Sequence, residues 1–244
     1  MTRLIAGITL MLASATPAIA QTADEIVEKH LAAIGGREAL GRIRSRVSSG
    51  KVTVTTPVGD LAGTVEAFAK APDKSRTLIK VDVTALGAGI VTNDQRFDGA
   101  SGYIIDTLNG NREITGAQLD ALKNNGFPTA WLDYKTRGHA VSLAGKEMVG
   151  DRSAFVLDVT PKTGPKARSW VDAETFLVLK TSVTVDAPPI GPLEQIMEFG
   201  DYRTVDGVKV PFLVKSINAT QTVTGILTEV KHNVEIDESS FKKP

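Results

Sequence analysis

The sequence contains no cysteine, and this absence excludes several kinds of site at once. None of the 244 residues is a cysteine, so the chain has no disulfide framework, no thiolate zinc site and no cysteine nucleophile. A chain of this length buries about 70% of its unfolded surface, so it reaches a stable core without covalent cross-links. Folding therefore has to rest on packing.

An excess of charge of either sign is missing as well. The chain carries 28 basic and 28 acidic residues and has a formal net charge of +0. Without a global field, it has no electrostatic means of attracting nucleic acid or an anionic membrane surface. Beyond residue 20, no apolar run reaches the length of about 20 residues that a membrane-spanning helix needs. We expect neither a nucleic-acid partner nor a transmembrane segment after export.

The first twenty residues have the features of a signal peptide. Arg3 precedes an apolar run over residues 4–15, and Pro17 ends it. A run of that length is typical of a signal-peptide core and too short to span a bilayer, which disfavours the alternative of an N-terminal anchor. The small residues Ala18 and Ala20 predict cleavage before Gln21. Residues 21–244 are then expected to be exported from the cytoplasm as a single domain.

Helical periodicity is confined to three short segments. Residues 23–34 place apolar side chains on one stripe, with Thr22 as the expected N-cap and Gly35 directly after the segment. Residues 37–44 predict a second short helix. Residues 115–125 predict a third helix. It is followed by Trp131, Leu132 and Tyr134, which we call the aromatic patch.

The rest of the chain alternates with the period of two that is typical of half-buried strands. Examples are Val52 and Val54, and the runs 177–185 and 208–214. Tight-turn pairs such as Asp98-Gly99 separate these runs. Many short strands joined by hairpin turns, without helices between them, predict a mainly β fold with an antiparallel sheet.

Residues suited to catalysis or metal binding are sparse. The only histidines are His30, His139 and His232, and none has a second histidine or a carboxylate at metal-ligand spacing. His30 lies on the apolar helical stripe, where a boundary histidine with one satisfied nitrogen is expected and a buried base or ligand-contacting group is the alternative. Ser101 follows a turn and lacks the strand and spacing of a nucleophile elbow. We predict no catalytic residue, no metal and no cofactor.

Eight segments, in order along the mature chain, resemble bacterial outer-membrane lipoprotein-sorting proteins of the LolA/LolB-like superfamily of periplasmic lipoprotein carriers. The segments are Ala23-Asp24-Glu25-Ile26-Val27, Ile34-Gly35-Gly36-Arg37-Glu38-Ala39-Leu40, Ile43-Arg44-Ser45-Arg46, Phe97-Asp98-Gly99, Leu132-Asp133-Tyr134-Lys135, Asp172-Ala173-Glu174-Thr175, residues 201–212 and Ile236-Asp237-Glu238-Ser239-Ser240-Phe241. The resemblance implies a strongly curved antiparallel sheet, an incomplete barrel, wrapped around short helices. It also implies an apolar cavity for acyl chains. It transfers no catalytic residue, and no residue here matches the groups that handle lipoproteins, so that role rests on fold analogy.

Three functions are compatible with these features. The first is a carrier of lipoprotein acyl chains or another lipid between the envelope membranes, with residues 115–125 and the aromatic patch as a lid. The second is an envelope sensor or scaffold that binds a protein partner. The third, an enzyme on the same scaffold, is disfavoured by the missing chemistry.

The expected ligand contacts are large residues on alternating strand faces. They are Phe155, Leu157, Trp170, Leu179, Met197 and Phe212. A packed face and a cavity wall have the same periodicity, so ordinary core remains the alternative for each of them.

Overall fold

The strands of the described chain join into one antiparallel sheet that bends strongly and stays open. The computed structural model describes residues 21–57, 59–187 and 191–244, so the predicted signal peptide, residues 1–20, lies outside them. The strands are β1 (Ser45–Thr56), β2 (Gly59–Lys70), β3 (Lys74–Asp82), β4 (Ile90–Phe97), β5 (Gly102–Asp106), β6 (Arg112–Ile114), β7 (Ala140–Val149), β8 (Arg152–Thr160), β9 (Ala167–Asp172), β10 (Val178–Ala187), β11 (Gly191–Val205), β12 (Val208–Ile217) and β13 (Thr222–His232).

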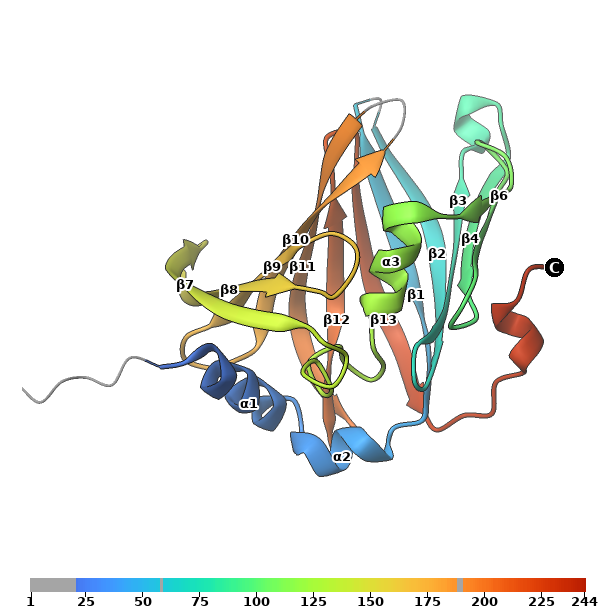
Figure 1. Cartoon of the computed structure of the whole chain (residues 1–244). Helices are drawn as coiled ribbons and strands as arrows, with labels where there is room; N and C mark the ends of the chain where they lie inside the picture. Colours follow the sequence, from blue (N-terminus) through green and yellow to red (C-terminus); the bar gives the residue numbers. More distant parts are fainter. Residues whose placement is uncertain (1–20, 58, 188–190) are drawn as a thin grey trace, which may run out of the picture.

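The sheet order is β6-β5-β4-β3-β2-β1-β13-β12-β11-β10-β9-β8-β7. Two meanders, β1 to β6 and β7 to β13, are joined where the first strand pairs with the last. Since β6 and β7 form the two edges, the sheet does not close into a barrel. Figure 1 shows the sheet bent around a concave face on which a short helix lies. The predicted open, curved antiparallel sheet is confirmed.

The helices are short and flank the sheet. They are α1 (Ala23–Ala33), α2 (Gly36–Arg42), α3 (Gly116–Asn124) and the 3₁₀ turns η1 (Thr84–Leu86) and η2 (Glu238–Phe241). The three predicted helices are present, with ends that shift by one or two residues. The Thr22 hydroxyl accepts from the Glu25 amide, and the Glu25 carboxylate accepts from the Thr22 amide. This capping box satisfies two amides that would otherwise lack partners.

Helices α1 and α2 cover one end of the sheet, at the bottom of Figure 1. The apolar stripe of α1, including Ile26 and Leu31, is buried against Phe155 and Leu157 of β8. Gly35, between the two helices, has φ +130, and a Cβ there would lie 2.6 Å from the carbonyl oxygen of Gly207. Only glycine allows the helices to approach the β11–β12 turn this closely.

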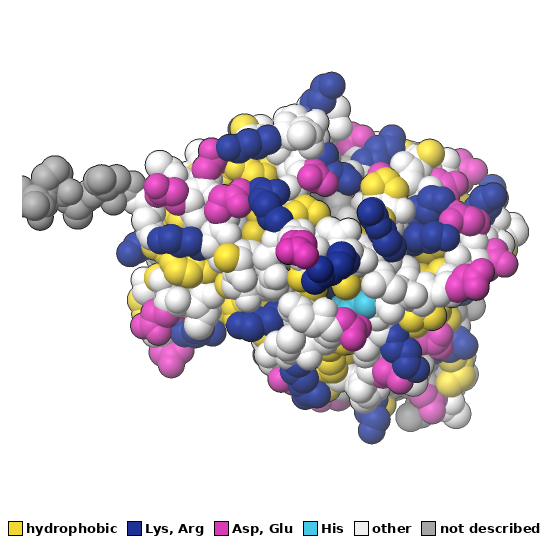
Figure 2. Space-filling view, turned by 90° about the horizontal axis from the view of Figure 1, so that it is seen from below, with side chains coloured by type: hydrophobic (Ala, Val, Ile, Leu, Met, Phe, Trp, Pro, Cys, Tyr) yellow, Lys and Arg dark blue, Asp and Glu magenta, His cyan; other side chains and the backbone are white. Residues whose placement is uncertain are grey.

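Charges of both signs are interspersed on the face seen from below in Figure 2. This distribution agrees with the balanced composition and leaves no single-sign patch on that face. None of the helices in the described part of the chain combines the length and the apolarity needed to cross a membrane.

Candidate ligand-binding site

The strand register places a continuous set of small and apolar side chains on the concave face. Val52 of β1 pairs with Gly63 of β2 and with Gly225 of β13. Met197 of β11 pairs with Ser216 of β12 and Thr181 of β10. Because directly opposed residues point to the same side of a sheet, these positions share one surface.

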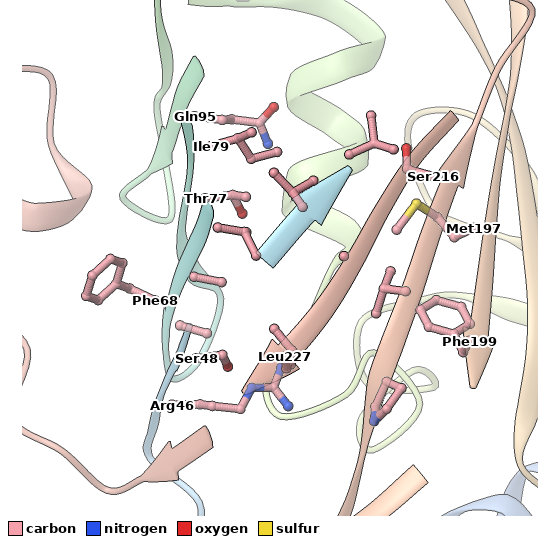
Figure 3. Close-up of a pocket in the computed structure, with 18 of the residues that line it drawn as sticks. Arg46, Ser48, Phe68, Thr77, Ile79, Gln95, Met197, Phe199, Ser216 and Leu227 are labelled. Carbon is pink, nitrogen blue, oxygen red and sulfur yellow. The ribbon is translucent and has the colours of Figure 1, made fainter. Parts of the chain in front are cut away.

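This surface encloses a hollow of about 690 Å³, which we call the main hollow. Its walls come from β1 to β4 and from β11 to β13. The lining residues are Arg46, Ser48, Val52, Val65, Ala67, Phe68, Ala69, Thr77, Ile79, Asn93, Gln95, Asn125, Gln195, Met197, Phe199, Val210, Pro211, Val214, Ser216, Val223, Gly225 and Leu227. Figure 3 shows Thr77 and Gln95 on one wall, Met197 and Ser216 on the other, and Arg46 at one end. The volume falls within the range of small-molecule pockets.

A second space of about 390 Å³, the side hollow, adjoins the main hollow. Its lining residues are Ala121, Asn124, Asn125, Ala130, Trp131, Tyr134, His139, Val159, Pro161, Pro165, Ala167, Ser169, Thr181, Ser182, Val183, Gln195 and Met197. Asn125, Gln195 and Met197 line both spaces. The end of α3 and the aromatic patch therefore form one wall of a space that continues into the main hollow.

The aromatic patch is tied to α1 by polar contacts. The Tyr134 hydroxyl donates to the Asp24 carboxylate, and Lys135 Nζ donates to Asp24 Oδ2 at 2.5 Å. These two hydrogen bonds, from Lys135 and from Tyr134, lower the pKa of Asp24. The wall of the side hollow is thus fixed at its α1 side.

Of the described residues that line the main hollow, Arg46 alone carries a charge. Its guanidinium lies over the Phe127 ring, with Cζ 5.4 Å from the ring centre. No ion pair joins Arg46 to an acidic side chain within the described residues. Burial lowers the pKa of Arg46, because desolvation penalises the charged form.

The three histidines occupy different environments. His30 lies on the buried face of α1, and its Nδ1 lies 2.8 Å from the Phe176 carbonyl oxygen. The prediction of one satisfied nitrogen is confirmed, but the predicted boundary position is wrong, because the apolar stripe of α1 packs against the sheet and buries the ring. Burial lowers the pKa of all three, with the charge of Arg137 acting second on His139 and that of Arg46 second on His232. Within the described chain, no group of three or more His, Asp or Glu side chains could hold a metal ion.

The six predicted ligand contacts lie in different places. Met197 lines both hollows. Phe155 and Leu157 lie in the cluster under α1, whereas Trp170 and Leu179 pack together with Ala154 and Val156 in a separate cluster.

Trp170 also has a polar contact, since its Nε1 donates to Glu147 Oε2 at 2.8 Å. Phe212 packs with Val210 and Val230. The structure thus brings Met197 to the hollows and places the other five in packed clusters. A ligand contact by any of the six stays a prediction.

Sequence reasoning did not select Arg46, although the pattern held a signal for it. Arg46 shares the strand face of Val52 and Val54, since the three residues are separated by even numbers of positions. A charge on an apolar strand face is unusual enough to mark a site. Small residues such as Ala67 could not be recognised in the sequence as lining a cavity, because only the register of the sheet shows that they share its concave face.

Comparison with known proteins gives results at the level of the fold. No protein-family model matches the sequence, and no curated protein matches it. A crystal structure of a LolA superfamily protein from Nitrosomonas europaea matches with a TM-score of 0.57 and 15% identity, covering 92% of this chain and 99% of that one.

Two further structures match over similar lengths. One is described as an outer membrane lipoprotein-sorting protein domain, from Vibrio parahaemolyticus, with a TM-score of 0.56 and 12% identity, covering 90% of this chain and 95% of that one. The other is a DUF1329 family protein from Desulfovibrio piger, with a TM-score of 0.57 and 13% identity, covering 90% of this chain and 97% of that one. At these identities the likeness establishes the fold, and this chain therefore has the LolA-like fold that the sequence segments predicted.

Proposed function

We propose that this protein is a periplasmic carrier that holds acyl chains, of lipoproteins or of another lipid, in the main hollow. Residues 21–244 act as one exported domain after cleavage before Gln21. The observation that supports the proposal most directly is an apolar space of about 690 Å³ on the concave face of the sheet. The proposal assigns the protein no catalytic step.

The physical basis of binding is the transfer of hydrocarbon out of water. Each buried CH₂ group contributes about 0.8 kcal/mol. The walls suit a flexible chain, because Val65, Ile79 and Val214 offer aliphatic surface while Ala67 and Gly225 leave room. A carrier of this kind discriminates weakly between chains and strongly against polar solutes.

We further propose that α3 and the aromatic patch form a lid. Asn125, directly after α3, lines both hollows. The described part of α3 contains no buried residue, so little apolar contact opposes its movement. Displacing α3 would widen the passage between the two hollows at Met197, while Tyr134 of the aromatic patch stays held to Asp24.

The experiment is to purify the protein from the cells that make it and to analyse an organic extract by mass spectrometry. We expect acyl lipid at close to one molecule per protein. The matched control is Ala67→Phe, which places a ring inside the main hollow and should remove most of the lipid. A wild-type extract without lipid, together with no binding of a fluorescent acyl-chain probe by the delipidated protein, would overturn the proposal.

A second candidate is an envelope scaffold that binds a protein partner, and the open sheet edge favours it. Edge strand β7 pairs with β8 on one side only, and most of its residues are exposed. An extended segment of a partner can add to such an edge through backbone hydrogen bonds. Recovery of one stoichiometric protein partner without lipid would support this function over the carrier.

A further inference from the structure

Arg46 has the surroundings of a ligand-binding group and lacks those of a structural one. It projects from β1 at one end of the main hollow, beside Leu227 (Figure 3). Its neighbours on the adjacent strands are Ala69 of β2 and His232 of β13. Neither neighbour supplies a negative charge.

The acidic side chain beside His232 is largely exposed and forms no ion pair with Arg46 within the described residues. Asp206 Oδ2 lies 3.3 Å from Nδ1 of His232. His232 is buried, and burial together with the charge of Arg46 lowers its pKa, so its ring is neutral near pH 7 and adds no second cation. A single positive charge therefore faces the hollow at this end.

Arg76 and Arg96 are half-buried like Arg46, but unlike Arg46 they are paired with a carboxylate. Arg76 and Arg96 both donate to the Asp94 carboxylate, with their Nη2 atoms 2.8 Å from Oδ2. A guanidinium stays charged at any pH at which the protein folds, so it cannot lower the cost of desolvation by losing its proton. Arg46 is half-buried and unpaired, so part of its hydration is lost without a compensating charge, and a ligand anion would supply that charge.

The N–H groups of Arg46 donate to no other described residue. The guanidinium carbon lies over the Phe127 ring, 5.4 Å from the ring centre. The N–H groups lie in the plane of the guanidinium, where they match the two oxygens of a carboxylate or phosphate. Between this group and Gln95 run aliphatic walls that include Ile79 and Leu227.

We propose that the main hollow binds a single-chain amphiphile with an anionic head, carboxylate or phosphate, and that Arg46 holds the head. This inference rests on the proposed carrier function and narrows it. The acyl chain lies along the aliphatic walls and the head lies at the Arg46 end. Neutral lipids of equal chain length bind more weakly.

The test compares ligands that differ in the head alone, by calorimetric titration of the delipidated protein with laurate, monododecyl phosphate and dodecanol. We expect both anions to bind about tenfold to a hundredfold more tightly than dodecanol, the range of a charge-assisted hydrogen bond. The tighter of the two anions identifies the head group. Equal affinity for dodecanol and the anions would overturn the inference while leaving the carrier function standing. Absence of binding by all three would contradict the carrier function itself.

Variants test the residue. Arg46→Met should lose the preference for anions and bind all three ligands as the wild type binds dodecanol, whereas Arg46→Lys should keep part of the preference. The matched control is Arg203→Met, since Arg203 also stacks on a ring, Phe212 at 4.4 Å, but is exposed and paired with Asp201.

The thermal midpoint separates a binding role from a structural one. Arg46→Met should melt at or above the wild-type temperature, because it removes an unpaired, half-buried charge and keeps an apolar side chain of similar length. A lowered midpoint with an unchanged preference for anions would show that Arg46 acts only in packing, and would overturn the inference.

Discussion

The two halves of the concave face differ in what covers them. On β8 and β9, large residues such as Phe155, Leu157 and Val171 meet α1, α2 and the aromatic patch, and the space is filled. On β1 to β4 and β11 to β13, small and medium residues such as Ala67 and Val214 face a hollow to which, among the described residues outside the strands, Asn125 after α3 contributes. One sheet thus builds an ordinary core at one end and a cavity wall at the other.

This difference shows that strand pattern does not decide between core and cavity. Both halves alternate with the same period, and both present aliphatic side chains inward. The deciding factor is which part of the concave face the helices cover. Helices α1 and α2 are too short to cover all of it, so they fill the space at β8 and β9 and leave the other half open. The predictions below test whether the two halves respond differently to equal changes.

The largest difference should come from removing a leucine side chain in each half. Leu157 is fully buried in the cluster under α1, whereas Leu227 lines the main hollow and is half-buried. Leu157→Ala should lower the free energy of unfolding by about 2–5 kcal/mol, because it leaves a cavity in a packed core. Leu227→Ala should cost about 1 kcal/mol, since its side chain already borders empty space. Urea unfolding monitored by circular dichroism measures both, and equal losses would mean that the main hollow is packed.

A larger side chain should reduce stability in a packed cluster, whereas in the main hollow it should reduce ligand binding instead. Ala154 is fully buried in the cluster with Trp170, on the face of β8 opposite to that of Leu157, so Ala154→Phe should destabilise the fold by about 1–3 kcal/mol through overpacking. Ala67→Phe should leave the free energy of unfolding within about 0.5 kcal/mol of wild type, because the ring enters the hollow. Thermal melting checks stability, and the acyl-probe titration checks occupancy. A strongly destabilised Ala67→Phe would show that the hollow has no room for a ring.

These contrasts explain how much the sequence predicts. The capped helix after Thr22, the hairpin turns and the antiparallel sheet follow from local periodicity and turn chemistry, so they were predictable. The pairing of β1 with β13 joins chain segments far apart in sequence, and it determines which side chains face the hollow.

The size of the side chains explains why most of the predicted ligand contacts lie outside the main hollow. Choosing large residues favoured positions such as Phe155 and Trp170, because size signals burial. The hollow is instead formed where residues are small, as at Ala67 and Gly225. Met197 was selected for its size and lines the hollow because its unbranched side chain lies between two walls.

A change of pH should alter the stability of the half of the sheet that α1 covers, through His30 of that helix. Burial lowers the pKa of His30 below its ordinary value of 6.5, so the unfolded chain binds a proton more readily than the folded one. Stability is therefore fully present above pH 6.5 and is lost as the pH falls below that value, towards the lower folded-state pKa. One such proton contributes at most about 1.4 kcal/mol per pH unit.

His30→Gln is the matching variant, because it removes the proton while keeping a side-chain donor for the Phe176 carbonyl. Urea unfolding at pH 7.5 and pH 5.5 should show a smaller loss for the variant than for the wild type. His139→Gln, at the edge of the side hollow, should change the pH dependence less, since His139 is half-buried as a residue whereas His30 is buried. An unchanged pH dependence in His30→Gln would contradict this assignment.

The smallest effect concerns Tyr134, which lies between the two halves. Its ring packs in the cluster under α1 and also lines the side hollow, and its hydroxyl donates to Asp24. Tyr134→Phe keeps the ring and removes the hydrogen bond, so the free energy of unfolding should fall by about 0.5–1 kcal/mol, with the half-exposed carboxylate returning to water. Hydrogen exchange of residues 131–134 should rise with little change in the exchange of β8. A loss above about 2 kcal/mol would mean that water cannot reach Asp24 in the variant, and would place this wall of the side hollow within the packed core.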